Sequence, residues 1–328
     1  MAIIPIWKDT KMSWLPVGEK VNYIISVDGA PIFNGRAYTL PNSIAAAINI
    51  NRIVRDYLTS KIDLTRDVYY YPQDGYRRTF EVTPANYGGE SSFEFINDYS
   101  YEDGERAEVR VLSAPLSNVV DPRQLLFTTF ANDGASAITP LALKTINGVA
   151  SSNQLSRVDK CATYTIPLYN KEYTGVTAVT FGIKGNETMV TYKVKQTPAR
   201  YCLYYLNAYG GFDHLLINGN DMRTDSMTRV EMTKDVGNTT LQHGRECIST
   251  EVTRKWRLYT DYLTDEQWAL THHLLGSQQV FLHNLESDEI TPVVITSNVA
   301  EFRTYRNQGN KMSYLTIDVE DASKRIRK

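Results

Sequence analysis

Histidines are the residues from which metal and acid–base sites are most often built, and this chain has five: His214, His243, His272, His273 and His283. His272 and His273 are adjacent in a predicted helix. Successive helical side chains point about 100° apart, so these two do not converge on one ion. Neither has a histidine or carboxylate four residues further on. We therefore predict no metal site, and we expect His272 to lie beside Trp268 with His273 exposed.

Nucleophilic and phosphate-binding motifs are also missing from the sequence. A serine or cysteine nucleophile needs a constrained turn and a nearby base, and the Gly-x-Ser-x-Gly pattern is absent. Cys202 lies in an apolar run, where a thiol stays protonated and inert. The pair Gly210–Gly211 is followed by Phe212 and Asp213 rather than by the Gly-Lys-Ser/Thr of a phosphate loop. We expect no enzyme activity, no catalytic residues and no cofactor.

Two acidic segments hold several oxygen ligands close together, Asp98–Glu105 and Asn218–Asp221. Neither reproduces the twelve-residue calcium loop with its closing glutamate, so we interpret both as solvated turns. The paired carboxylates of a glycoside hydrolase meet only in three dimensions, and the sequence leaves that possibility open. The 22 tyrosines would also suit a sugar-binding platform. A surface glycan-binding β-sandwich protein, either adhesin- or lectin-like or an accessory to a glycoside hydrolase, is therefore the alternative function.

The totals exclude several classes of partner. The 328 residues suggest about two compact units. With 35 basic and 37 acidic residues the net charge is -2, which gives no field to attract nucleic acid, and we expect no specific nucleic-acid binding. Cys161, Cys202 and Cys247 are far apart in sequence and are expected to be reduced thiols. We find no signal peptide and no apolar run of 18 residues, so we expect a soluble protein without a membrane partner.

Short apolar runs separated by turn residues, together with the excess of tyrosine, predict a mainly β protein with a few helices. The expected class is α+β, with antiparallel sheets in sandwich- or barrel-like domains. Residues 1–20 read as an extended N-terminal arm, because Pro5 and Pro16 forbid a helix through it. Its apolar side chains need a surface, which is either the chain's own sheet or a neighbouring subunit.

Three further segments follow the arm. Residues 21–62 predict a hairpin that turns at Asp28–Gly29, then an amphipathic helix over Asn42–Thr59 favoured by Ala45–Ala47. Residues 63–198 predict a β-sandwich-like domain. Within it, residues 132–157 are poor in large apolar groups, and we interpret them as a long surface loop that contacts another subunit.

Residues 199–328 predict a C-terminal β domain with one helix, 264–276, which opens with the capping box Thr264–Gln267. Tyr201–Leu206 alternates like a strand covered on both sides, and Gly210–Gly211 would let the chain pass tightly against a neighbouring element. A closing hairpin, Val299–Arg306 with Lys311–Glu320, would turn Leu315, Ile317 and Val319 inward. The structural and interface candidates are Trp7, Trp14, Tyr205, Gly210, Gly211, Phe212, Trp256 and Trp268.

These C-terminal stretches carry a resemblance to a known group of proteins. Tyr201–Asp213, Trp256–Gln267 and the terminal hairpin resemble virion proteins of tailed phages that infect Bacteroidetes, in particular the crAss-like phages. Val27–Arg36 and Val120–Gln124 fit the same pattern, as does Ile48–Leu58. No site residues carry over from this resemblance, because such proteins have interfaces in place of catalytic centres.

The resemblance implies a non-enzymatic structural protein, a ring-forming subunit of the tail or of the head–tail neck. Its partners would be copies of itself in a homo-oligomeric ring and other tail, neck or portal proteins. Its location would be the virion, assembled in the cytoplasm of the bacterial host. In a cyclic ring each subunit meets its neighbour with a different face.

Overall fold

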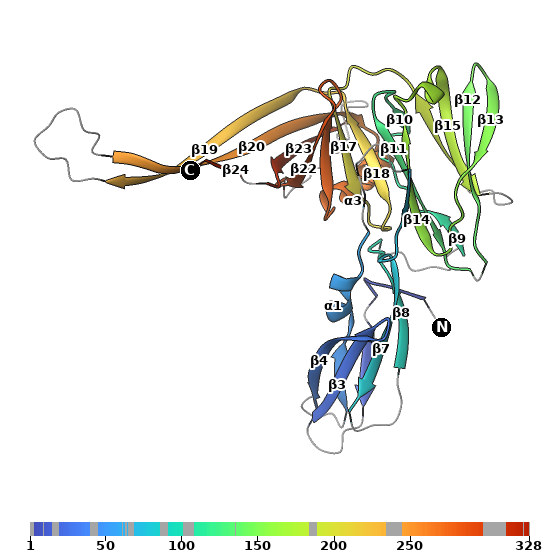
Figure 1. Cartoon of the computed structure of the whole chain (residues 1–328), viewed down its shortest axis with the longest axis vertical. Coiled ribbons are helices and arrows are strands. Elements are labelled where there is room, and N and C mark those ends of the chain that lie inside the picture. Colours follow the sequence, from blue (N-terminus) through green and yellow to red (C-terminus); the bar gives the residue numbers. More distant parts are fainter. Residues whose placement is uncertain are drawn as a thin grey trace, which may run out of the picture. The chain divides into compact units, whose positions relative to one another are not determined.

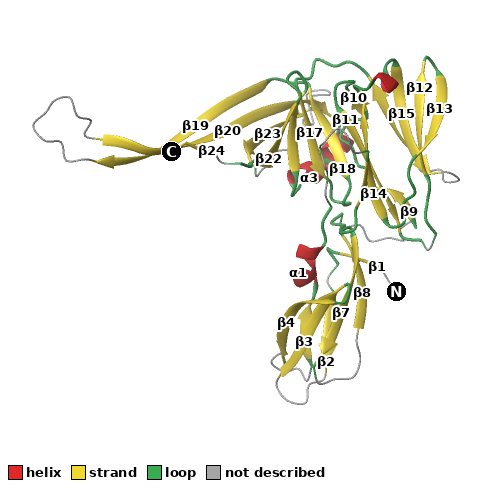
Figure 2. Ribbon diagram, in the orientation of Figure 1, coloured by secondary structure: helices red, strands yellow, loops and turns green. Residues whose placement is uncertain are grey.

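The computed structural model describes residues 3–8, 10–14, 20–39, 45–60, 62, 64, 69–85, 91–100, 108–134, 136–183, 189–233, 245–297, 313–323 and 325–327. Strands dominate these residues and helices are few and short (Figure 2). Nearly all neighbouring strands pair antiparallel, as in β3 with β4 and β11 with β14. The predicted fold class, mainly β with antiparallel sheets and a few helices, is therefore confirmed.

The chain divides into two compact units, and neither is continuous in sequence. The N-terminal unit comprises Met1–Ser113, Leu125–Lys193 and Asn207–Asp213. The C-terminal unit comprises Ala114–Gln124, Val194–Leu206 and His214–Lys328. Three short segments, 114–124, 194–206 and 207–213, thus belong to a different unit from the chain on either side of them. The segments expected from the sequence were consecutive and contained no such exchanges between units.

The first sheet of the N-terminal unit has the strand order β1-β8-β7-β3-β4 (Figure 1). Its strands are β1 (Ile3–Pro5), β3 (Lys20–Val27), β4 (Ala30–Tyr38), β7 (Arg77–Pro84) and β8 (Ser91–Ile96). Asp28 and Gly29 have φ angles of 49° and 80°, so they form the tight turn predicted between β3 and β4.

The described part of the N-terminal arm lies on strands of its own chain. β1 runs parallel to β8, and β2 (Lys11–Trp14) pairs with β5 (Ala46–Asn49). The sequence left open whether the arm lies on the chain's own sheet or on a neighbouring subunit. The described part of the arm lies on the chain's own strands.

The amphipathic helix predicted over Asn42–Thr59 is wrong in its first part. Residues 42–44 lie outside the described residues, and the rest forms β5, a single helical turn α1 (Asn51–Val54) and the 3₁₀ turn η1 (Arg55–Tyr57). Asn51 fixes this arrangement: its amide nitrogen donates to the carbonyls of Ile6 and Lys8, each at 2.6 Å. The pairing of β5 with β2, together with these hydrogen bonds to Ile6 and Lys8, thus outweighs the helix propensity of the alanines.

Two further antiparallel ladders complete the N-terminal unit. One has the order β6-β14-β11-β9, built from β6 (Tyr70–Pro72), β9 (Val109–Val111), β11 (Leu125–Asn132) and β14 (Cys161–Pro167). The other runs β16-β15-β12-β13, from β12 (Pro140–Ile146), β13 (Val149–Gln154), β15 (Val176–Ile183) and β16 (Met189–Val194). The turn η2 (Lys171–Tyr173) precedes β15. Every residue of β11 and β14 is buried, so these two strands form a core layer.

The long surface loop predicted over 132–157 is also wrong, because most of it is the hairpin β12–β13. Asn147 and Gly148, with φ angles of 49° and 82°, form its turn. The Asn-Gly pair is a strong hairpin signal in itself. β13 was not predicted because its side chains are mostly small and polar, and all are exposed. It therefore lacks the apolar alternation by which strands are recognised in a sequence.

The C-terminal unit is built on one large sheet, in the order β18-β17-β21-β22-β23-β20-β19 (Figure 1). The strands are β17 (Tyr201–Leu206), β18 (Phe212–Ile217), β19 (Asp221–Thr233), β20 (Arg245–Leu263), β21 (Val280–Asn284), β22 (Glu289–Ile295) and β23 (Ser313–Asp321). β24 (Arg325–Arg327) pairs with β20. β10 (Val119–Val120) lies in segment 114–124, which belongs to this unit although the chain on either side of it does not.

The core of this sheet includes all six residues of β17 and the inward side chains of β23. Leu315, Ile317 and Val319 are buried, as predicted. Their expected hairpin partner, Val299–Arg306, lies outside the described residues. β23 pairs with β20 and β22.

The predicted helix 264–276 is divided in two. α2 (Asp265–Ala269) starts with the predicted capping box, and α3 (Thr271–Leu275) follows a break at Leu270. The break changes the phase of the second helix, so His273 is buried and His272 is exposed. This is the reverse of the expectation from one continuous helix.

The turn after β17 packs as closely as its glycines suggested. The side-chain oxygen of Asn207 accepts hydrogen bonds from the amides of Tyr209 and Gly211, each at 3.0 Å. Gly210 has a φ of +86°, and a Cβ there would press on the Asn97 carbonyl. A Cβ on Gly211 would meet the carbonyl oxygen of Leu112. All these groups belong to the N-terminal unit.

β18 contains two buried ionisable residues, Asp213 and His214, and burial strongly shifts the pKa of the histidine. The imidazole of His214 is fully buried, and this desolvation lowers its pKa to about 4, although a hydrogen bond with the backbone of Val119 partly offsets the effect. The ring is therefore neutral in the folded protein at pH values where an exposed histidine is charged.

Alanine at Gly210 should destabilise the protein more than alanine at Gly148. Both glycines have a positive φ, so both variants suffer backbone strain of roughly 1–2 kcal/mol. Only Gly210 is crowded, and overpacking adds about 1–3 kcal/mol, whereas nothing lies within 4 Å of a Cβ at Gly148. Urea unfolding of both variants measures the difference. Equal losses would show that the turn can relax.

Acid should destabilise the protein through His214 between pH 6.5 and about 4. In this window the unfolded chain binds a proton that the folded chain does not, so stability is present above pH 6.5 and falls with pH. The loss amounts to about 3 kcal/mol by pH 4. In His214→Gln the fall in urea midpoint between pH 7 and pH 4.5 should shrink, while the exposed-site control His272→Gln should behave like the wild type. Identical pH profiles for all three proteins would contradict this.

Candidate functional site

The residues singled out from the sequence are mostly parts of the core. Tyr205 and Phe212 are fully buried, and Trp256 is 6% exposed in the core of the C-terminal sheet. Trp268 packs half-buried against that same core. They act as packing residues in the folded chain. Of the N-terminal tryptophans, Trp7 is half-buried after β1 and Trp14 lies in β2, with its side chain outside the described residues.

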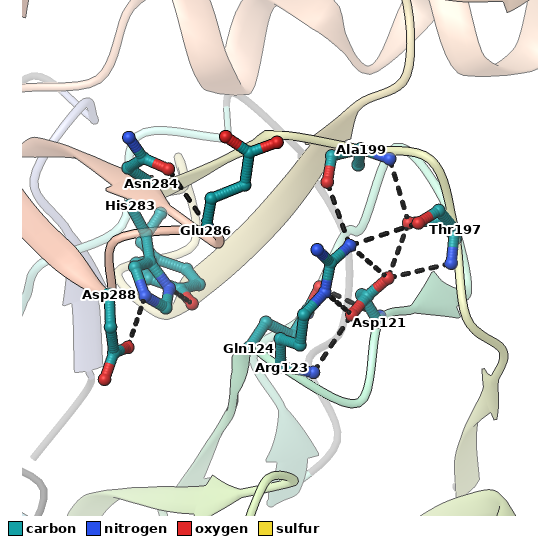
Figure 3. Close-up of polar contacts among 10 residues, drawn as sticks. Asp121, Arg123, Gln124, Thr197, Ala199, His283, Asn284, Glu286 and Asp288 are labelled. Carbon is teal, nitrogen blue, oxygen red and sulfur yellow. Dashed lines mark hydrogen bonds and ion pairs between the residues drawn. The ribbon is translucent and has the colours of Figure 1, made fainter.

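A network of polar contacts in the C-terminal unit is centred on Asp121 (Figure 3). One carboxylate oxygen accepts from the amide of Arg123 at 3.0 Å and from its Nε at 2.8 Å. The other accepts from the amide and hydroxyl of Thr197, at 2.8 and 2.7 Å. The Arg123 guanidinium also donates to the carbonyls of Thr197 and Ala199. The loop after β10 is thereby fastened to the chain that leads into β17.

The electrostatics of this network favour the ion pair. Burial raises the pKa of the Asp121 carboxyl, but the hydrogen bonds from Arg123 and Thr197 outweigh it and leave the pKa below its ordinary value. The carboxylate is therefore ionised at neutral pH and its oxygens are occupied by donors. Since these oxygens are taken up by the fold, we interpret the network as a structural fastening.

A second chain of contacts links Tyr204, His283 and Asp288 (Figure 3). The Tyr204 hydroxyl lies 2.8 Å from His283 Nδ1, and Nε2 lies 3.0 Å from Asp288 Oδ1. The tautomer that satisfies both contacts carries its proton on Nε2 and accepts from the tyrosine. The order acid, histidine, hydroxyl is that of a nucleophilic triad. Here, however, the hydroxyl end is fully buried, so no substrate reaches it.

The thiol of Cys202 lies beside this chain of contacts, directly across the sheet from His283. Burial raises the pKa of the Cys202 thiol, which stays protonated as the sequence predicted. Within the described ranges no group of three or more histidine, cysteine or acidic side chains is placed to hold a metal ion. Nor does any described helix have the length and apolar character to cross a membrane.

The largest exposed feature of the C-terminal unit is the hairpin of β19 and β20 (Figure 1). Its strands are 13 and 19 residues long, and every residue of β19 after Asp221 is exposed. β20 pairs with β23 only from Lys255 to Leu263, and its preceding residues pair with β19 and, at three positions, β24. Exposed apolar side chains along the hairpin are Met222, Met227, Val230, Met232 and Ile248.

The sequence reading missed β19 altogether, since its alternation is between charged and uncharged residues with few large apolar groups. A two-stranded ribbon is marginally stable in water by itself. Exposed methionine, valine and isoleucine side chains along such a ribbon are the signature of a contact surface. The hairpin β19–β20 is therefore the candidate functional site.

A smaller exposed feature is a cluster of three tyrosines on β20 and β23. Tyr262 and Tyr314 are direct cross-strand partners, with ring centroids 6.4 Å apart, and Tyr259 lies 6.0 Å from Tyr314. Tyr262 is 66% and Tyr314 is 54% exposed. The three rings together present an aromatic surface with polar tips.

No family model and no curated protein matches this chain. Among solved structures, one from work on the host cell surface retention of a 1.5-MDa bacterial ice-binding adhesin is similar over 77% of this chain and 87% of its own length, at 8% sequence identity. The TM-score of that superposition is 0.18, which identifies neither a shared fold nor a shared function.

Proposed function

We propose that this protein is a non-enzymatic structural subunit of a tailed phage virion, and that it forms a ring in the tail or in the head–tail neck. The observation that carries the proposal is the hairpin β19–β20, which exposes both faces of a 13-residue strand and several apolar side chains. Packing on another subunit would add stability to such a ribbon and bury its exposed apolar side chains.

The contact that follows is heterologous. The apolar side chains near the distal end of the described hairpin, Val230, Met232 and Ile248, would pack on a different surface of the next subunit, and repetition of that contact closes a ring. The core side of the same β20 strand, with Trp256 and Leu258 buried, would hold the hairpin at its base.

Two other features support a structural role. The buried polar side chains around Asp121 and around His283 in the C-terminal unit form hydrogen bonds that join loops and strands of the fold to one another. The stretches that resemble phage virion proteins, Tyr201–Asp213 and Trp256–Gln267, fall on core strands, the close-packed turn and the capped helix.

The proposal predicts that the purified full chain assembles into closed, ring-sized oligomers, which mass photometry and negative-stain electron microscopy will detect. Ile248→Asp should abolish these rings, because a charge would be buried in the contact. The matched control is Met189→Asp, a similarly exposed apolar position on another sheet. A wild-type chain that remains monomeric or dimeric at every soluble concentration would overturn the proposal.

The tyrosine cluster supports a second candidate function, glycan binding at a surface. Tyr262→Ala combined with Tyr314→Ala should then abolish binding on a glycan array while leaving the thermal unfolding midpoint unchanged, since both rings are more than half exposed. Tyr38→Ala, at another exposed tyrosine, is the control. A wild-type chain that binds no glycan on the array would exclude this second candidate.

A further inference from the structure

β19 is an edge strand whose outer side is open. In the sheet order it stands last, next to β20, and no other described strand pairs with it. Edge strands are usually kept short or carry lysine and proline that prevent pairing. β19 has 13 residues and contains no lysine, proline or glycine. The register shift near Val230 places the extra residue, Ile248, in β20, so β19 itself stays regular.

The two faces of β19 differ in charge. Alternate residues of a strand share a face, and one face is entirely uncharged. Its exposed members are Met222, Thr224, Ser226, Thr228, Val230 and Met232. The other face carries two basic and three acidic residues with one methionine between them: Asp221, Arg223, Asp225, Met227, Arg229 and Glu231. Within the strand, Arg223 and Asp225 form an exposed ion pair at 3.0 Å.

The charged face is complementary to itself. If a second β19 lies antiparallel with Met227 opposite Met227, then Arg223 faces Glu231 and Asp225 faces Arg229. The four charges from Arg223 to Glu231 are then each opposite a charge of the other sign, in both halves of the pair, and Asp221 lies opposite Thr233. Directly opposed residues in antiparallel strands are close enough for such pairs to stabilise the sheet.

The uncharged face matches in the same register. Met222 lies opposite Met232, Thr224 opposite Val230 and Ser226 opposite Thr228. Methionines thus meet at both ends of the contact and hydroxyl groups meet near its centre. A contact with opposite-charge pairs on one face and uncharged pairs on the other, methionines at its ends, has the electrostatic complementarity that sets the register of an interface.

The neighbouring registers are unfavourable. Two copies related by a two-fold axis perpendicular to the sheet keep each residue on its own face, so the register changes only in steps of two residues. One step in one direction places Asp225 opposite Glu231. One step in the other places Arg223 opposite Arg229. Like charges directly opposite are destabilising, so both adjacent registers are less favourable than the one centred on Met227, which also keeps the longest run of opposite-charge pairs.

We propose that two copies of this chain pair through β19, antiparallel and centred on Met227, so that their C-terminal sheets become one continuous sheet. The backbone groups on the open edge supply hydrogen bonds, and the charges set the register. This contact does not rest on the proposed virion function. In a ring-forming subunit it would join two rings face to face.

A cysteine on the two-fold axis tests the geometry directly. In the background Cys247→Ser, Met227→Cys should form a covalent dimer under mild oxidation, because opposed Cα atoms in such a pair lie about 4.5–5.5 Å apart, within disulfide range. Met222→Cys in the same background should not, since its two copies would be roughly 33 Å apart. Non-reducing gel electrophoresis of the full chain reads out both results.

Charge reversal tests the register without a covalent bond. Arg229→Glu and Asp225→Arg should each raise the dimer Kd by roughly tenfold or more in sedimentation velocity. An equimolar mixture of the two variants should restore dimers, because each reversed charge then faces its complement. Lys193→Glu, an exposed strand cation in another sheet, should leave the Kd unchanged.

The outcomes separate this proposal from the ring proposal. A wild-type chain that never dimerises, or a dimer unaffected by both charge reversals, would overturn the pairing. So would equal cross-linking at positions 222 and 227. Rings that form without cross-linking at Met227→Cys would overturn the pairing but not the ring, whereas cross-linked dimers without rings would support the pairing alone.

Discussion

The C-terminal unit depends on a single strand, β20, whose backbone hydrogen-bonds to three others along its 19 residues. Near its end it pairs with β23 and contributes Trp256 and Leu258 to the core. Near its beginning it pairs with β19 and briefly with β24, outside that core. Burial at one end thus stabilises an extended ribbon at the other, which neither strand of the hairpin would maintain in water by itself.

The polar residues of the described chain follow a consistent division of roles. Those inside the C-terminal unit, such as Asp121 and His283, have their donors and acceptors occupied by neighbouring groups of the fold. Those on β19 face outward and alternate in sign. The hydrogen bonds of Asp121 and His283 therefore help to specify how these strands and loops are joined.

Local signals allowed much of this fold to be predicted from the sequence. The Asp28–Gly29 turn, the Thr264 capping box and the alternation at Leu315 each depend on residues only a few positions apart. The wrong predictions arose where contacts with residues distant in the sequence determine the local structure. β5 is a strand because it meets β2, although its alanines favour a helix. The phase of His272 and His273 depended on the break at Leu270 between α2 and α3, which no residue pattern in the sequence marks.

The candidate site was harder to predict than the core. Apolar periodicity marks buried strands, so it identified β17 and β23 but not β19, whose exposed residues lack that pattern. The aromatic residues chosen as structural and interface candidates, Tyr205, Phe212 and Trp256, are buried in the folded chain, so they are structural and not part of the exposed hairpin. An antiparallel self-complementary charge pattern was present in the sequence, but it acquires meaning only once the strand is known to be an open edge.

The discontinuous units have a consequence for how the chain folds. Residues 114–124 and 194–206 are synthesised long before the C-terminal strand β23 with which they share a unit. Until β23 emerges, β22 and the last part of β20, from Lys255 to Leu263, lack the strand that pairs with both of them. Contacts between such distant segments make folding slow and leave strand edges exposed meanwhile. Because both units combine segments from distant parts of the chain, neither can be isolated by simply shortening it, and the C-terminal unit is completed only after β23 has been made.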